Sequence, residues 1–353
     1  MTQMVCQVDR THAGEKVVAK VKKNGFSSTS LQLDAAQSVD SISKSIRQSL
    51  AKNLKRRGSV VGLSGGIDST VTLGLCVKAI GPEKVFAVLM PETGVDEESG
   101  RLGELAARHF GVDYTSENIT PALEALGHYR RYAEAVRMVI PQYGPGWKSK
   151  VVTSDTLSTS GYTYFFLVAQ EPGGQTHKVR LPMKPYLEIL AATNFKQRTR
   201  KMIEYHHADR LHYAVAGTPN RLEYELGFFV KQGDGSADIK PIAHLYKSQV
   251  YQLAEHLGVP AAIRERMPTT GTFSMDQGQD EFFFSLPYDK MDLCLYARNN
   301  VIPAEIVAPA VGLTTDQVKR VFADIDIKRS TTRYLHMPPI LMEGVPGVSF
   351  SSG

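Results

Sequence analysis

The amino-acid sequence predicts an α/β fold, a Rossmann-like doubly wound parallel sheet with an inserted excursion and C-terminal helices. Strands and helices alternate in the N-terminal half, as they do where crossover helices cover a parallel sheet. A glycine turn joins the first expected strand directly to a helix. The chain has 353 residues, of which 42% are apolar, and this is enough to bury the core of one large domain.

The expected elements follow one another along the chain. The first thirty residues mix Lys, Ser, Thr and Gly without a sustained apolar period, so residues 1–30 are predicted to be a disordered tail. Apolar positions recur at helical spacing over residues 38–54, ahead of the first strand at 59–63. The later expected elements are helices at 69–80, 97–110, 248–257 and 303–311 and strands at 85–90 and 211–216.

One domain is expected over residues 31–345, followed by a short tail at 346–353. Within it the composition changes between residues 127 and 185, where Tyr, Gly, Pro, Ser and Thr accumulate around a β-leaning stretch. This region, 127–185, is interpreted as an insertion that could contain a β-hairpin. A helical segment over residues 300–330 is expected near the C-terminus.

Composition argues against several classes of protein. No apolar run approaches the roughly 20 residues that a membrane span requires, and the N-terminus lacks the layout of a secretory signal, so we expect a soluble cytoplasmic protein. Cys6, Cys76 and Cys294 lie far apart and form no CxxC pair, which argues against a zinc knuckle or a disulfide framework. The net charge of +5 comes from scattered Lys and Arg, and it suits ATP or a dinucleotide as well as a nucleic acid.

The strongest functional signal is a turn between an apolar strand and a helix, which reads Ser64-Gly65-Gly66-Ile67-Asp68-Ser69-Thr70. The two glycines let backbone amides approach an anion, the helix directs its positive dipole end at the same place, and the hydroxyls add donors. The turn is therefore predicted to bind phosphate. The competing interpretation is a tight strand-to-helix connection in which Ser64 only caps the helix.

The turn differs from two better-known phosphate loops. It lacks the lysine of the Walker sequence GxxxxGK[ST], and it lacks the GxGxxG spacing of dinucleotide-binding turns. An acid, Asp68, takes the place of the lysine and can hold Mg²⁺ against the phosphates of ATP. We interpret the turn as a site for attack at the α-phosphate, with pyrophosphate as the leaving group.

This heptapeptide resembles the pyrophosphate loop of the N-type ATP pyrophosphatases, the adenine nucleotide alpha-hydrolase family, which includes NAD, GMP and asparagine synthetases and several tRNA-modifying enzymes. Further blocks are similar to the NAD synthetases in order, spacing and residue type, at 194–200, 217–223, 227–238, 241–242, 245–249, 268–270 and 287–292. Together they cover most of residues 38–340 outside the insertion. The resemblance implies the fold of that family and a homodimer.

The resemblance also implies roles for individual residues. ATP would contact Ser64, Gly65, Gly66, Asp68, Ser69, Thr218, Lys247 and Thr269. Asp68 and Glu223 would share Mg²⁺. The substrate would be bound by Arg198, Glu223, Lys231 and Asp238, and the catalytic residues would be Asp68, Lys247 and Lys328. Taken singly, an acid or a lysine on a helix is more often a solvated surface residue, and only the ordered set of residues favours a functional interpretation.

The implied reaction needs no protein nucleophile. The carboxylate of deamido-NAD would attack the α-phosphorus of ATP, pyrophosphate would leave, and ammonia would displace AMP from the acyl adenylate to give NAD. Catalysis would then rest on alignment and charge stabilisation. Because the chain has no extra domain of nitrilase size, free ammonia is the expected nitrogen donor, although a separate glutaminase subunit stays conceivable.

Two features depart from the family pattern. The family often carries a His-Lys pair near the C-terminus, whereas the matching stretch here reads Asp326-Ile327-Lys328-Arg329. The frequent Asp of a Pro-Thr-Ala-Asp loop is replaced by Gly271 or displaced. These departures leave open a related ligase that amidates a different carboxylate in a biosynthetic pathway.

Other interpretations are weaker. Four possible metal ligands lie within seven positions, His206, His207, Asp209 and His212. A metal cluster is the weaker interpretation, because histidines that face solvent or cap a helix are the simpler explanation. Trp147 could stack on a nicotinate ring or pack within the insertion. Residues 302–322 superficially resemble a DNA-binding helix-turn-helix, but their acidic surroundings disfavour a nucleic acid. A tRNA-thiolating enzyme lacks a suitable cysteine, and an inactive scaffold would not need the intact acids and lysine of the site.

Overall fold

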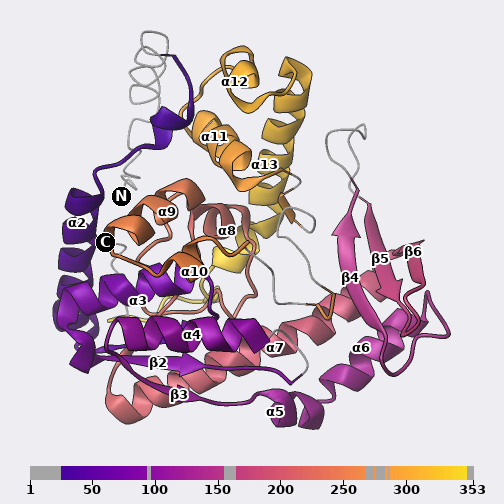
Figure 1. The fold of residues 1–353 in the computed structure, drawn as a ribbon, viewed down its shortest axis with the longest axis horizontal. Helices are drawn as coiled ribbons and strands as arrows, with labels where there is room; N and C mark the ends of the chain where they lie inside the picture. The colour runs from indigo at the N-terminus through magenta and orange to yellow at the C-terminus, as the bar shows by residue number, and fades with distance from the viewer. Residues whose placement is uncertain are drawn as a thin grey trace.

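The computed structural model describes residues 25–93, 97–154, 164–267, 273–275, 283–284 and 286–347 (Figure 1). The described chain is a mixed α/β structure around a parallel sheet, as the sequence predicts. Thr269 and most of the expected N-terminal tail lie outside the described residues. Near the start of the described chain, a short 3-10 helix, η1 (Ser28–Leu31), places Leu31 in a hydrophobic core.

Four parallel strands form the central sheet in the order β3-β2-β1-β7. β1 (Ser59–Leu63) has the predicted bounds and lies between β2 (Val85–Leu89) and β7 (Ala214–Ala216). β3 (Asp113–Ser116) pairs with β2 at the edge of the sheet. β3 was not predicted from the sequence, because this strand is only four residues long and lacks an apolar run.

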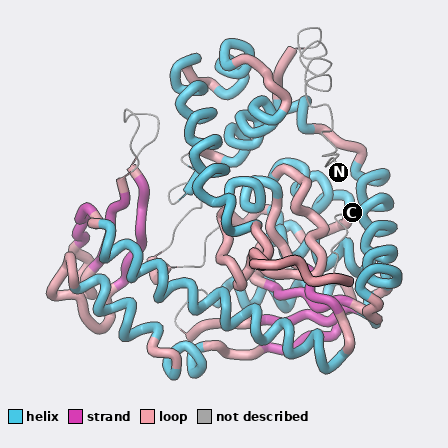
Figure 2. Tube along the Cα trace, turned by 180° about the vertical axis from the view of Figure 1, so that it is seen from behind, coloured by secondary structure: helices cyan, strands magenta, loops and turns pink. Residues whose placement is uncertain are grey.

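Helices cover both faces of this sheet. One face is covered by α2 (Ala35–Gln48), α3 (Ile67–Ile80), α4 (Glu97–His109) and α9 (Lys247–His256). The other face is covered by α5 (Thr120–Ala125) and α7 (Met183–Leu211). Val61 and Leu63 of β1 point into the first of these cores, and Val60 points into the second. Successive side chains of a strand point to opposite faces, so a strand covered on both sides carries an unbroken apolar run. Figure 1 shows α3 and α4 lying across β2, and the reverse view shows helices on the other side as well (Figure 2).

The remaining described elements are η2 (Ser49–Leu54), η3 (Pro82–Lys84), α6 (His128–Arg137), β4 (Lys148–Thr153), β5 (Phe165–Gln170), β6 (Thr176–Arg180), α8 (Arg221–Leu226), α10 (Ala261–Arg264), α11 (Tyr288–Asn299), α12 (Ala304–Val311) and α13 (Thr315–His336). The predicted helices differ from the observed ones by a few residues at their ends, where capping rather than apolar spacing decides the boundary.

The region predicted as an insertion contains a small antiparallel sheet. β4, β5 and β6 pair in that order, so the region contains the β-hairpin that was considered, formed by β5 and β6, and a third strand, β4, beside it. Val151 and Leu167 of this sheet share an apolar core with Val136 of α6. Trp147 stacks on His177 inside the same region, with 5.5 Å between the ring centroids, so the indole packs within the insertion. In Figure 1 these strands stand apart from the central sheet, at the right.

α7 is a helix of 29 residues that was not among the predicted elements. The predicted start of a strand at residue 211 is wrong, because Leu211 still belongs to the helix and His212 ends it in the left-handed conformation, at φ 58°. His206 and His207 lie on this helix. Within the described ranges there is no group of three or more His, Cys, Asp or Glu side chains that could hold a metal ion.

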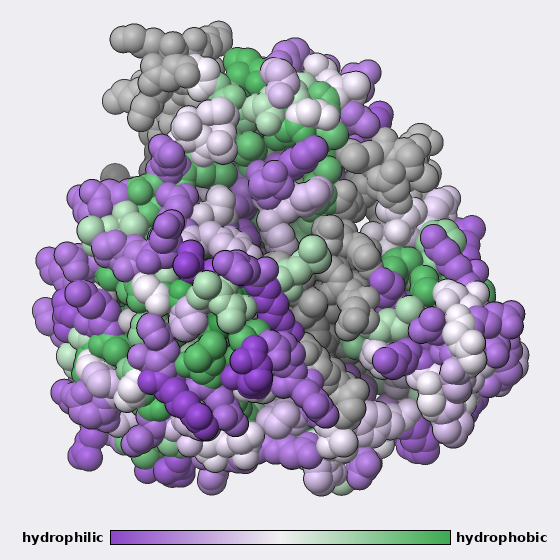
Figure 3. Space-filling view, in the orientation of Figure 1, coloured by the Kyte–Doolittle hydropathy of each residue, from purple (hydrophilic) through white to green (hydrophobic). Residues whose placement is uncertain are grey.

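α11, α12 and α13 form a helical layer with a core of its own. Val307 of α12 and Val318 and Ile325 of α13 are buried there. The last helix continues to His336, beyond the predicted segment. Seen from the side of Figure 1, the surface is mostly hydrophilic, with apolar residues gathered over these C-terminal helices (Figure 3). Among the helices that the structure describes, none combines the length and the apolar character that a membrane span needs.

Candidate active site

The candidate phosphate loop connects β1 to α3, as predicted. Gly65 has φ +73°, and a Cβ at this position would lie 2.3 Å from the backbone oxygen of Ser99 in α4, so only glycine suits both the conformation and the packing. α3 begins at Ile67, two residues earlier than predicted, and Gly66 is its N-cap. None of the described side chains caps this helix. The interpretation of Ser64 as a cap is therefore wrong, and the first amides of α3 can face an anion.

Hydroxyl groups hold the shape of the loop. Ser69 and Thr70 each donate a hydrogen bond to the carbonyl oxygen of Gly66, at 3.0 and 2.9 Å. The hydroxyl oxygens of Ser64 and Ser69 lie 3.3 Å apart. Because Thr70 is fully buried, its hydroxyl shapes the turn, whereas Ser64 is exposed on the side where a ligand would lie.

Three charged side chains meet beside the loop. Asp68 lies in the first turn of α3, Glu223 lies in the first turn of α8, and Lys247 is the first residue of α9. Lys247 is only 1% exposed, and its Nζ pairs with Oδ2 of Asp68. Asn220, the N-cap of α8, donates from Nδ2 to Oδ1 of Asp68 at 3.3 Å and from its backbone N–H to Oε2 of Glu223 at 3.1 Å. Residues far apart in the sequence thus form one compact charged centre.

Two acids share one cation in this centre. Burial, and then the charge of Asp68, raise the pKa of Glu223 to about 8. Burial alone would lower the pKa of Lys247, but the charges of Asp68 and Glu223 raise it above its ordinary value. Two carboxylates beside one ammonium favour a further cation, and hard oxygen ligands of this kind suit Mg²⁺. The side chains of Asp68 and Glu223 therefore fit the metal that the sequence predicts.

Asp292 of α11 supports Lys247 from behind, a role that the sequence analysis missed. Asp292 is fully buried and accepts hydrogen bonds from the backbone N–H groups of Lys247 at 3.2 Å and Ser248 at 2.6 Å. Burial raises its pKa to about 6. The carboxylate thereby satisfies the first amides of α9. In the sequence, Asp292 stands out only as the last residue of the family-like block 287–292, and no role was predicted for it.

A cleft of about 740 Å³ lies over the charged centre. Most of the predicted site residues line it, namely Ser64, Gly66, Asp68, Ser69, Arg198, Thr218, Glu223, Lys231, Lys247 and Lys328. Gly65 and Asp238 are described but do not belong to the lining. Oδ2 of Asp238 accepts a hydrogen bond from the backbone N–H of Val215 in β7 at 2.7 Å, so this acid holds the chain beside the sheet.

Comparison with known proteins identifies the family. The model of the NAD synthase family matches residues 38–139 and 175–332, more than half of the chain. The chain belongs to the NAD synthase family. The match confirms the resemblance found in the sequence. The two matched stretches leave out residues 140–174, so most of the small antiparallel sheet lies outside the family pattern.

Individual relatives agree with this assignment. The NH(3)-dependent NAD(+) synthetase of Rhizobium meliloti (strain 1021) is 55% identical over 320 residues, which cover 91% of this chain and 96% of that protein. The solved NMN synthetase from Francisella tularensis has a TM-score of 0.60 at 20% identity, over 88% of this chain and 99% of that chain. The NH3-dependent NAD synthetase from Campylobacter jejuni subsp. jejuni has a TM-score of 0.58 at 20% identity, over 88% and 100%. At such low identity the two structures support the fold alone.

In this NAD synthase chain, Lys231, predicted to bind the substrate, and Lys328, predicted to be catalytic, make contacts within the wall of the cleft. Nζ of Lys231 donates to the carbonyl oxygens of Tyr334 at 2.7 Å and Met337 at 3.1 Å, at the end of α13. Nζ of Lys328 lies 2.5 Å from Oδ2 of Asp324. Arg198 donates from Nε to the carbonyl oxygen of Lys231 at 3.3 Å. Contact of these three cations with a substrate stays a prediction.

A line of buried and half-buried charges on α7 was not predicted from the sequence. Lys196, Arg200 and Glu204 follow at intervals of four residues and line the cleft from one face of the helix. Nζ of Lys196 lies 2.9 Å from Oε2 of Glu92, and both side chains are buried. Glu204 lies 2.6 Å from Lys201 in a second buried pair. The spacing is visible in the sequence, but the partner of Lys196 is more than one hundred residues away.

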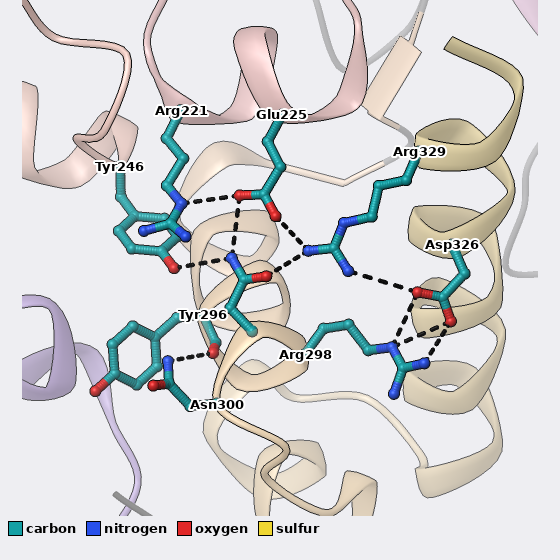
Figure 4. Close-up of polar contacts among 9 residues, drawn as sticks. Arg221, Glu225, Tyr246, Tyr296, Arg298, Asn300, Asp326 and Arg329 are labelled. Atoms are coloured by element: carbon teal, nitrogen blue, oxygen red, sulfur yellow. Dashed lines mark hydrogen bonds and ion pairs between the residues drawn. The ribbon is translucent and has the colours of Figure 1, made fainter. Parts of the chain in front are cut away.

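An ionic network behind the cleft joins α8, α11 and α13 (Figure 4). Glu225 accepts hydrogen bonds from Arg221 at 2.8 Å and from Asn299 at 3.0 Å, and it also pairs with Arg329. Arg329 extends the network to Asp326, at 3.5 Å. Although burial opposes the shift, the hydrogen bond and charge of Arg221 and the charge of Arg329 lower the pKa of Glu225. The network therefore fixes α13, which lines the cleft, against α8, which carries a candidate metal ligand.

Proposed function

We propose that this protein is an ammonia-dependent NAD synthetase, which adenylates the carboxylate of deamido-NAD with ATP and then amidates it. The observation that carries the proposal is the charged centre of Asp68, Glu223 and Lys247 beside an uncapped helix N-terminus in a chain of this family. The name of the Rhizobium meliloti relative, which this chain matches over 91% of its length, supports the same reaction.

The first step forms the acyl adenylate. An oxygen of the substrate carboxylate attacks the α-phosphorus of ATP, and the bond from that phosphorus to the bridging oxygen of pyrophosphate breaks. The amides at the start of α3 receive the departing pyrophosphate, and Lys247 stabilises its developing charge. Asp68 and Glu223 would hold Mg²⁺, which neutralises phosphate charge when bound.

The second step forms the amide. Ammonia attacks the acyl carbon of the adenylate, AMP leaves with the electron pair of the broken C–O bond, and the nitrogen loses a proton to solvent. No covalent bond to the protein is needed, so alignment of the two substrates in the cleft supplies most of the catalysis. We propose that the enzyme works in the cytoplasm as a homodimer on free ammonia, with ammonia supply by a separate glutaminase as the alternative.

The proposal is tested by incubating the protein with ATP, Mg²⁺, ammonium and deamido-NAD and measuring NAD, AMP and pyrophosphate. Equal amounts of the three products are expected. Pyrophosphate release with a different carboxylate and not with deamido-NAD would move the assignment to a related ligase, the alternative that the altered C-terminal Lys328 stretch leaves open. No pyrophosphate with any acid would refute the proposal. Acceleration by glutamine only when a second protein is added would indicate a glutaminase partner.

A further inference from the structure

The end of the cleft contributed by the insertion is aromatic. Phe165 of β5 stacks on Tyr186 of α7, with 4.0 Å between the ring centroids and 18° between the ring planes. Thr153 of β4 and Leu190 of α7 line the cleft with them. We call these four residues the aromatic wall. Thr153 and Phe165 belong to residues 140–174, the stretch that the family model leaves out, so this part of the cleft is a feature of the insertion.

The aromatic wall lies far from the phosphate loop. α7 lines the cleft along one face, with Tyr186, Leu190, Asn194 and Arg198 at intervals of four residues. At a rise of about 1.5 Å per residue, the helix spans about 18 Å from Tyr186 to Arg198. It then continues to Glu204, whose carboxylate would lie 2.7 Å from a Cβ placed on Gly62 in β1, next to the loop. The cleft thus has a charged end and an aromatic end.

The two rings retain the capacity to bind a ligand. Phe165 and Tyr186 are both only partly buried. Among the residues that the structure describes, the hydroxyl of Tyr186 has no hydrogen-bond partner, although burial of the ring raises its pKa to about 12. Rings that only filled a core would be closed off on all sides, whereas these two pack against the core of the insertion and also line the cleft.

We propose that the aromatic wall binds the planar base at the far end of the dinucleotide substrate, and that the insertion thereby makes the enzyme prefer a dinucleotide to a mononucleotide. The inference rests on the proposed function, since it concerns the same cleft. A substrate whose carboxylate reacts at the charged centre must extend along α7 to reach Tyr186, and a dinucleotide has a second base with which to do so. Stacking of a base on an aromatic side chain contributes about 1–3 kcal/mol, or about 5- to 150-fold in binding.

β5 provides a matched control for the test. Phe166 follows Phe165 directly but points to the other face of the strand, where Lys178 lies 5.0 Å from its ring centroid. Phe166 does not line the cleft. Phe165→Ala and Phe166→Ala therefore remove the same side chain from the same strand, and only the first change affects the aromatic wall.

The experiment compares kcat/KM for deamido-NAD and for its nicotinate mononucleotide half. Phe165→Ala and Tyr186→Leu are expected to lower kcat/KM for the dinucleotide about 5- to 150-fold, and to leave the mononucleotide value and the KM for ATP within about threefold of those of the wild type. Phe165→Trp, which keeps a stacking surface, should retain the preference, and Phe166→Ala should retain it too. Equal losses with both acceptors, or no loss with either, would overturn the inference.

Binding measurements separate this inference from the proposed function. If the wild type forms no NAD, the proposed function is refuted, and calorimetric titration with deamido-NAD still tests the aromatic wall. Weaker binding to the Phe165→Ala protein than to the Phe166→Ala protein would support the wall as a base-binding surface. Equal binding to both proteins, or no binding to the wild type, would overturn it.

Discussion

Replacing Glu223 with glutamine is expected to stabilise the ligand-free protein while abolishing its activity. The pKa of Glu223 is raised from 4.5 to about 8, so the folded protein holds a proton there that the unfolded chain releases. Stability is therefore lost as pH rises from about 4.5 through about 8. At about 1.4 kcal/mol per pH unit, ionising Glu223 in the folded protein would lower the free energy of unfolding by nearly 5 kcal/mol. Because Glu223 lines the cleft, solvent screens its charge, and we expect a loss of about 2–3 kcal/mol. Glutamine keeps an oxygen that can accept the hydrogen bond from Asn220 and removes the charge.

The assay is urea unfolding of the ligand-free protein at pH 6 and pH 9. Glu223→Gln should be more stable than the wild type at pH 9 by about 2–3 kcal/mol, with a smaller difference at pH 6. Glu225→Gln is the matched control on the same helix. Because the pKa of Glu225 is lowered, that acid contributes stability above its unfolded pKa, and the control should be less stable than the wild type at both pH values. A Glu223→Gln protein that is destabilised, or whose difference from the wild type does not grow with pH, would refute the reasoning.

Three further changes test the site. Asp68→Asn should lower kcat by about 10²- to 10³-fold or more, and turnover close to that of the wild type in a kinetic assay would mean that the metal site is misassigned. Lys247→Met leaves the half-buried Asp68 without its cation, so urea unfolding should show a loss of stability of about 3 kcal/mol, the low end for a buried pair because Asp68 faces the cleft, and an unchanged midpoint would contradict the pairing. Glu225→Gln and Arg329→Gln should show a coupling energy of about 0.5–3 kcal/mol in a double-mutant cycle, whereas Arg298→Gln, at an exposed pair with Asp326, should show little coupling to Glu225.

The fold was most predictable where local sequence decides the structure. The strand at 59–63 has the expected bounds because both of its faces are apolar and a glycine turn ends it. α3 started earlier than predicted because Gly66, which has no side chain, is its N-cap. The expected strand at 211 was displaced because a long helix continued into an apolar stretch, and periodicity alone does not separate the two.

The candidate site could be predicted in part. The loop glycines and Asp68 are adjacent in sequence, so their chemistry is visible there, and the placement of Glu223 and Lys247 beside them came only from the family resemblance. Contacts that depend on tertiary structure escaped the sequence analysis. Lys196 of α7 pairs with Glu92, more than one hundred residues away. Phe165 and Tyr186 of the aromatic wall are closer in sequence, but they meet only because the sheet of the insertion packs against α7.

In the proposed reaction, a substrate carboxylate attacks the α-phosphorus of ATP beside the loop at Asp68. Deamido-NAD that carries ¹⁸O in both carboxylate oxygens tests this step. Mass spectrometry of the products should find one labelled oxygen in the phosphate of AMP, one in the amide of NAD, and none in pyrophosphate. Label in pyrophosphate or free phosphate, or AMP without label, would contradict the account.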